Sequence, residues 1–182
     1  MKDGFIRAAA LTPKIRVADT AYNAEQIERG IDEAVENGAR ILVFPELCIT
    51  GYTCQDLFLQ ETLLSGAKEA LRRIAAHTEE MDALVFVGLP LEKDGKLYNV
   101  AAALHDGRVL AFIPKTALPN YAEFYEVRHF NPAPEQVEFL AFENETIPFG
   151  REILFACDGV EGLPVGGEIC EDLWAAQTPS TA

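Results

Sequence analysis

Two short, uninterrupted apolar runs, residues 41–44 and 84–87, most constrain how this chain can fold. Runs of this length favour a β-strand over a helix, and a run that is apolar throughout is typical of a strand buried on both faces of a sheet. Each run follows a segment whose apolar residues recur at helical spacing, residues 24–35 and 62–77. With a further strand-like segment at 5–11, this alternation predicts an α/β domain.

The second half of the chain has strand-like segments without helices between them. Residues 97–104 and 109–113 flank Asp106-Gly107, a pair typical of tight hairpin turns, and Asp94-Gly95 marks the preceding turn. Two more strand-like segments follow at residues 152–156 and 163–169. Strands that follow one another in this way pair antiparallel, so the sheet is expected to be mixed. No repeat, low-complexity tract or linker divides the 182 residues, which we interpret as one domain.

Charge and cysteine content exclude several classes of protein. The chain has 29 acidic and 15 basic residues, a net charge of -14, which disfavours a nucleic-acid partner or an anionic membrane surface. No apolar run approaches the roughly 18 residues of a membrane span, and the N-terminus does not have the pattern of a signal peptide. The four cysteines form neither a Cys-x-x-Cys pair nor a cluster with histidine. A reduced, cytoplasmic protein without a metal site is therefore expected.

Three polar residues, Glu46, Lys115 and Cys170, each come just beyond the end of a predicted strand. Ligands of open α/β sheets bind beyond the carboxyl ends of strands, so these side chains can converge there. Taken singly, each has an ordinary alternative. A Glu or Lys after a proline is usually a solvated loop residue, and a cysteine in a strand is more often a small buried hydrophobe. Position alone leaves their role open.

The local sequences around these residues are more specific. In chain order they are Phe44-Pro45-Glu46-Leu47 with Gly51-Tyr52, Ile113-Pro114-Lys115-Thr116, and Glu168-Ile169-Cys170-Glu171-Asp172. Together they resemble the nitrilase, or carbon-nitrogen hydrolase, superfamily, and the resemblance covers nearly the whole chain. It implies an α-β-β-α sandwich with mixed sheets, of which this chain is an N-terminal portion. It also implies a Glu-Lys-Cys triad of Glu46, Lys115 and Cys170.

In such a triad Cys170 is the nucleophile of amide hydrolysis. A free thiol has a pKa of about 8.5 and is mostly protonated at neutral pH, so Glu46 would accept its proton and later pass it to the leaving amine. Lys115 would stabilise the thiolate and the oxyanion. Attack on a carboxamide releases ammonia and leaves a thioester, which water activated by Glu46 hydrolyses. Three acidic neighbours are expected to raise the pKa of the thiol: Glu168, Glu171 and Asp172.

Three longer stretches, residues 51–58, 118–126 and 168–174, are similar to one family in particular, the glutamine-dependent NAD synthetases. This resemblance implies a glutaminase domain, residues 1–182, incomplete at its C-terminus. In that family glutamine supplies ammonia to a C-terminal synthetase domain, absent here, which uses ATP and Mg to convert nicotinic acid adenine dinucleotide to NAD. No cofactor is implied for the glutaminase domain, and the full-length enzyme is expected to be a homo-oligomer.

The same resemblance implies a glutamine pocket. Tyr121, Phe124 and Glu171 match positions that contact bound glutamine, and Tyr52 matches a position lining the pocket. Glu123 matches the additional carboxylate of nitrilases, which orients the lysine. The alternatives are ordinary core aromatics and, for Glu171, a solvated residue.

Two rival functions stay open. One is a stand-alone amidase or carbamoylase of the nitrilase superfamily that uses the same triad. The other is a binding module without activity. A downstream ATP-pyrophosphatase-type domain in the reading frame would favour the NAD synthetase. The remaining candidates have weaker signals: His77 and His105 are expected at the surface, His129 near the pocket in a supporting role, and Cys48 and Cys54 in packing.

Overall fold

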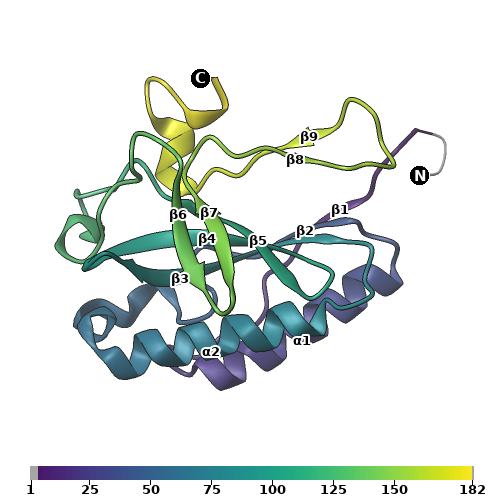
Figure 1. The fold of residues 1–182 in the computed structure, drawn as a ribbon. Helices are drawn as coiled ribbons and strands as arrows, with labels where there is room; N and C mark the ends of the chain where they lie inside the picture. The colour runs from purple at the N-terminus through teal and green to yellow at the C-terminus, as the bar shows by residue number, and fades with distance from the viewer. Residues whose placement is uncertain (1–3, 182) are drawn as a thin grey trace.

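A seven-stranded mixed sheet, in the order β1-β2-β3-β4-β5-β7-β6, organises the computed structural model, which describes residues 4–181. Its strands are β1 (Ala8–Ala10), β2 (Ile41–Val43), β3 (Leu84–Lys93), β4 (Lys96–His105), β5 (Arg108–Pro114), β6 (Glu138–Phe142) and β7 (Glu145–Phe149). Helices α1 (Thr20–Glu36) and α2 (Glu61–His77) cover one face. The small hairpin β8 (Phe155–Ala156) and β9 (Pro164–Val165) lies over the other (Figure 1). The predicted mixed α/β fold is confirmed.

The two helices form where the apolar periodicity predicted them. Asp19 caps α1, since its Oδ1 accepts a hydrogen bond from Tyr22 N at 3.1 Å. Gly38 follows the end of this helix with a φ of 82°, the left-handed conformation that glycine adopts without strain. Ile27 and Ile31 of α1 and Leu71 of α2 are fully buried against the sheet. This helix-covered face therefore carries the main hydrophobic core.

The opposite face of the sheet is covered far less. Phe86 of β3 is buried, and its ring lies 5.7 Å from that of Phe155 in β8. In β2, by contrast, Leu42 points to the helices and is fully buried, whereas Val43 is 46% exposed. The prediction that residues 41–44 are buried on both faces is therefore wrong for β2. Of the two helical layers of the expected sandwich, residues 4–181 contain one, formed by α1 and α2.

Tight hairpins join the central strands. The turn between β3 and β4 is Asp94-Gly95 and that between β4 and β5 is Asp106-Gly107; all four residues have positive φ, as two-residue hairpin turns require. Both turns were predicted. The hairpin of β6 and β7 was not, and β8 and β9 are shorter than the predicted segments 152–156 and 163–169.

Short 3-10 helices lie in the segments between and after the strands, and they contain several of the predicted site residues, among them Tyr52 and Cys170. They are η1 (Tyr52–Leu59), η2 (Glu126–Arg128), η3 (Cys170–Trp174) and η4 (Pro179–Thr181). Among the described residues, neither α-helix has the length and apolar character needed to cross a membrane.

Candidate active site

Glu46 lies in a turn that packs directly onto the central strand β3. The backbone crosses so close to Gly88 that a Cβ added there would lie 2.3 Å from Leu47 N and 2.8 Å from Pro45 O. The thiol of Cys48 supports the same contact, since it accepts a hydrogen bond from Gly88 N at 3.4 Å. Only glycine at position 88 lets the turn that carries Glu46 sit at this depth.

Lys115, directly after β5, is a fully buried cation between two carboxylates. Its Nζ donates to Glu46 Oε1 and to Glu126 Oε1, both at 2.7 Å. Burial pushes the pKa of Lys115 down, but the hydrogen bonds to Glu126 and Glu46 outweigh it, so the pKa lies above its usual value. Lys115 is therefore charged and cannot act as a base at neutral pH.

Glu126 opens η2 and is only 4% exposed. Burial raises its pKa, opposed by hydrogen bonds from Lys115 and from Tyr52, whose hydroxyl donates to Glu126 Oε1 at 2.7 Å. The carboxylate that orients the lysine is therefore Glu126. This corrects the prediction for Glu123, which is exposed, because the chain turns inward three residues later, where η2 begins.

Cys170 begins η3 with a φ of 48°, an uncommon conformation for a residue with a side chain and one that clusters at functional sites. The residue is exposed to solvent. Partial burial raises the pKa of its thiol, the negative charge of Glu46 raises it further, and the charge of Lys115 lowers it. The resting cysteine therefore needs a base, and Glu46 is the carboxylate beside it.

Asp172 ties the turn of Cys170 to the segment after Lys115. Its Oδ1 accepts from Thr116 N at 2.9 Å and from Ala117 N at 2.7 Å, and its Oδ2 accepts from Ile169 N at 3.2 Å. The side chain is 2% exposed, and these backbone donors oppose the rise in its pKa that burial causes. Asp172 thus holds the backbone just before Cys170 against the backbone just after Lys115.

The acidic neighbours of Cys170 act differently from the prediction. Asp172 is engaged with backbone amides, and Glu168 Oε1 accepts from Ser180 N at 2.6 Å. The carboxylate with the largest effect on the pKa of the thiol is Glu46. The acidic residue that most raises this pKa is therefore Glu46, which is distant in sequence, and not a neighbour of Cys170 along the chain.

The predicted glutamine-binding residues gather beside the triad, with one exception. The Tyr121 hydroxyl lies 3.0 Å from Glu171 Oε2. The ring of Phe124 packs edge-on against both tyrosines, with centroids 5.7 Å from Tyr121 and 6.4 Å from Tyr52. Tyr52 in turn reaches the lysine through Glu126. Glu123 is exposed and does not contact the lysine.

Sequence reasoning missed Glu126, Asn99 and the anchoring role of Asp172. Asn99 of β4 is 1% exposed and donates from Nδ2 to Glu46 Oε1 at 2.5 Å. The sequence did contain a signal for Asn99: it is a polar residue in the middle of a strand whose other residues from 97 to 104 are hydrophobic. For Glu126 there was none, because Glu123 and Glu126 lie in the same irregular stretch and either could reach Lys115.

The histidines lie outside the triad. His129, which was predicted to have a supporting role near the pocket, contacts η1: its Nε2 lies 3.0 Å from Asp56 Oδ1. His77 pairs with Asp32 at 2.7 Å, and His105 Nδ1 lies 3.0 Å from the carbonyl of Ala83. Both were predicted at the surface, and both are half-buried there. Within residues 4–181, no group of three or more His, Cys, Asp or Glu is arranged to hold a metal.

The remaining cysteines fit a structural reading. Cys48 and Cys54 are buried and free, and the Cys54 thiol donates to the carbonyl of Thr50 at 3.2 Å. Burial raises the pKa of Cys48 to about 12, so this thiol is unreactive. Both are packing residues, as predicted. Cys157, in the loop after β8, is exposed.

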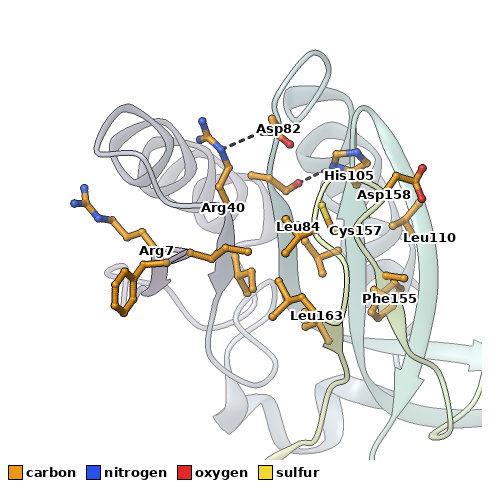
Figure 2. A pocket seen from close by; sticks show the side chains of 18 of the residues that line it. Arg7, Arg40, Asp82, Leu84, His105, Leu110, Phe155, Cys157, Asp158 and Leu163 are labelled. Atoms are coloured by element: carbon orange, nitrogen blue, oxygen red, sulfur yellow. Dashed lines mark hydrogen bonds and ion pairs between the residues drawn. The ribbon is translucent and has the colours of Figure 1, made fainter. Parts of the chain in front are cut away.

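A cavity of about 1110 Å³ lies away from these residues, between the hairpin of β8 and β9 and the face of the sheet beneath it (Figure 2). Arg40 and Asp82 form an ion pair of 3.1 Å at its rim, and Leu84 and Phe155 line it. No triad candidate lines this cavity. It borders the poorly covered face of the sheet, and the catalytic candidates lie elsewhere.

Known proteins match this arrangement over nearly the whole chain. A glutamine-dependent NAD synthetase of Mycobacterium tuberculosis is 34% identical over 177 residues, 97% of this chain and 26% of the relative. One from Xylella fastidiosa is 38% identical over 174 residues. The crystal structure of a glutamine-dependent NAD synthetase from Cytophaga hutchinsonii is 34% identical, with a TM-score of 0.83 over 91% of this chain and 28% of that one. The chain thus spans about a quarter of the length of these relatives.

An amidase shares the fold as well. The crystal structure of an amidase from Nesterenkonia sp. has a TM-score of 0.62 and 24% identity, and covers 81% of this chain and 56% of that one. The sequence matches the carbon-nitrogen hydrolase family over residues 7–180. With the mixed α/β fold, this match shows that the chain belongs to the carbon-nitrogen hydrolase family.

Proposed function

We propose that this chain is the glutaminase part of a glutamine-dependent NAD synthetase and that it hydrolyses the side-chain amide of glutamine through a thioester on Cys170. The observation that carries the proposal is the buried Lys115 cation, held by Glu46 and Glu126 and acting electrostatically on the Cys170 thiol. A fixed positive charge, a carboxylate base and a thiol at one place are the groups that amide hydrolysis needs.

The chemistry follows from these positions. Glu46 takes the proton of the Cys170 thiol as sulfur attacks the amide carbon, and it returns that proton to the nitrogen as ammonia leaves. Lys115 is held in place by two carboxylates, so its charge needs no rearrangement when the tetrahedral oxyanion forms. Water then gives a proton to Glu46 and attacks the thioester, which releases glutamate and the thiol.

Glutamine is proposed as the substrate because of the residues beside Cys170, at the entrance of the site. Glu171 presents a carboxylate that the Tyr121 hydroxyl contacts, with the aromatic ring of Phe124 beside it. A carboxylate at this point suits the α-ammonium group of glutamine, which a simple amide lacks. The relatives named glutamine-dependent NAD synthetases support the same choice.

The full-length protein is proposed to pass the ammonia to a C-terminal synthetase domain. Its relatives are about four times longer than the matched segment. There ATP and Mg would serve the amination of nicotinic acid adenine dinucleotide to NAD. The thiol of Cys170 must stay reduced for this reaction, which fits a cytoplasmic enzyme.

Replacing Cys170 by alanine in the full-length protein tests the proposal. We expect Cys170→Ala to lower glutamine-dependent NAD formation by about 10⁴-fold or more, because the nucleophile is lost, and to spare synthesis from added ammonia. Both rates are measured as NAD formed per enzyme. Cys157→Ala, at an exposed cysteine away from the triad, is the matched control and should change neither rate. Equal loss of both activities in Cys170→Ala would contradict the assignment.

A stand-alone amidase is the second candidate, because an amidase shares the fold. It predicts hydrolysis of small aliphatic amides, such as propionamide, at least as fast as that of glutamine. The glutaminase predicts a strong preference for glutamine that Glu171→Gln weakens, since this change removes the negative charge at the mouth of the site.

A further inference from the structure

Asn99 forms hydrogen bonds with two of the three catalytic candidates, Glu46 and Lys115. It lies in the middle of β4, paired with Pro90 of β3, and is 1% exposed. Its side-chain Nδ2 donates to Glu46 Oε1 at 2.5 Å, and its backbone carbonyl accepts from Lys115 N at 2.9 Å. The backbone contact survives any substitution at this position, so a change of side chain isolates the contact with Glu46.

The amide of Asn99 is poorly satisfied by the core around it. Its Oδ1 is buried and has no hydrogen-bond partner among the described residues. An unsatisfied buried acceptor costs about 1–3 kcal/mol, which an apolar side chain would avoid. The one side-chain hydrogen bond of Asn99 in the described structure goes to Glu46. The amide therefore serves the carboxylate and not the packing of the sheet.

The two oxygens of Glu46 are not equivalent. Lys115 Nζ at 2.7 Å and Asn99 Nδ2 at 2.5 Å both donate to Oε1, and neither contacts Oε2. A carboxylate oxygen with two donors in place is a poor site for a further proton, because that proton would face N–H groups. Oε2 is left as the oxygen that can gain and lose a proton.

We propose that Asn99 is a positioning residue that pins Oε1 of Glu46 and so commits Oε2 to proton transfer. The proposal rests on the glutaminase function proposed above. The thiol proton of Cys170 moves to Oε2 as the sulfur–carbon bond forms and the carbonyl becomes an oxyanion. When the carbonyl re-forms, the carbon–nitrogen bond breaks, the nitrogen takes the proton from Oε2, and ammonia leaves. In the second half, water gives its proton to Oε2, and the departing sulfur takes it back.

Two substrates with different leaving groups test this role in the full-length protein. Glutamine needs a proton on its leaving nitrogen, whereas the γ-thiophenyl ester of glutamate releases a thiolate that needs none. The variants are Asn99→Ala and Asn99→Asp; the second keeps the volume of asparagine and removes the donor. Asn131→Ala is the control, since Asn131 donates to the carbonyl of Leu97 and contacts none of the three catalytic candidates. The leaving group released in the first turnover is measured for each.

We expect Asn99→Ala and Asn99→Asp to slow the first turnover of glutamine by about 10²-fold, as a misplaced catalytic group does, with KM for glutamine nearly unchanged. The thioester should slow by less than about tenfold, since it bypasses proton delivery to the leaving group. Equal losses on both substrates, or no loss, would overturn the role of Asn99 and leave the glutaminase intact. A wild-type protein that releases no ammonia from glutamine would instead overturn the proposed function itself.

Discussion

Lys115 and Lys93 are both buried lysines that contact two carboxylates each, but their surroundings differ. Lys115 is fully buried, and its partners Glu46 and Glu126 are 16% and 4% exposed. Lys93 is 8% exposed and contacts Glu138 at 2.7 Å and Asp94 at 2.5 Å, but these partners are 46% and 82% exposed.

The difference lies in where the negative charges are, not in the lysine. The carboxylates around Lys93 remain solvated, and the ion pairs connect the turn after β3 to the edge strand β6. Hydrogen bonds to Asp94 and Glu138 raise the pKa of Lys93. At Lys115 the carboxylates are largely out of water, where electrostatic interactions are stronger, and Cys170, the proposed nucleophile, is close enough for both charges to act on its thiol. A lysine between two carboxylates thus indicates a catalytic site only when its partners are also buried.

Replacing each lysine by methionine tests this contrast most strongly. Lys115→Met should lower glutamine hydrolysis by about 10³-fold, because the oxyanion loses its cation. It should also lower the free energy of unfolding by about 3–5 kcal/mol, since two largely buried carboxylates are left without the cation that neutralises them. Lys93→Met should cost about 1 kcal/mol and leave activity unchanged, because its partners stay solvated. Kinetics and denaturant unfolding of the full-length protein provide the measurements, and similar losses in the two variants would refute the contrast.

Two glycines sharpen the comparison at the level of the backbone. Gly88 supports the turn that carries Glu46, whereas Gly95 lies in the turn beside Asp94, and nothing lies within 4 Å of a Cβ added at Gly95. Gly88→Ala should displace Glu46 and lower kcat by about 10²-fold. Gly95→Ala should cost about 1 kcal/mol of stability through its positive φ and leave kcat alone.

Steady-state kinetics and thermal unfolding of both glycine variants check this. Unchanged kcat in Gly88→Ala would mean that the turn tolerates the shift, and that the close packing on β3 is not what places Glu46.

A smaller effect concerns the reactivity of the thiol. The charge of Glu46 raises the pKa of Cys170, so Glu46→Gln should lower that pKa and increase the thiolate fraction at neutral pH. Alkylation of Cys170 by iodoacetamide should then speed up by as much as about tenfold, although catalysis is lost. Peptide mass spectrometry measures the rate, with exposed Cys157 as an internal reference. Glu138→Gln removes the same charge beside Lys93 and should leave alkylation unchanged; slower alkylation in Glu46→Gln would contradict the assignment.

The sequence by itself determined the helices, the central strands and the order of the catalytic candidates. These features are local: apolar spacing predicts the helices at 24–35 and 62–77, and Asp-Gly pairs predict the tight turns. The motifs around Glu46, Lys115 and Cys170 were enough to indicate the carbon-nitrogen hydrolase family, which the match over residues 7–180 confirms. The hairpin of β6 and β7 was not predicted, because Pro148 and charged residues interrupt the apolar pattern of its strands.

Only the tertiary structure decided which side chains meet. Glu123 and Glu126 are equally plausible in sequence, and the inward turn at η2 selects Glu126 as the partner of Lys115. Asn99 reaches Glu46 across the sheet, from 53 residues away. The exposure of Val43 likewise depends on what covers the second face of β2. Contacts between distant segments follow from the path of the whole chain, which local periodicity and spacing do not contain.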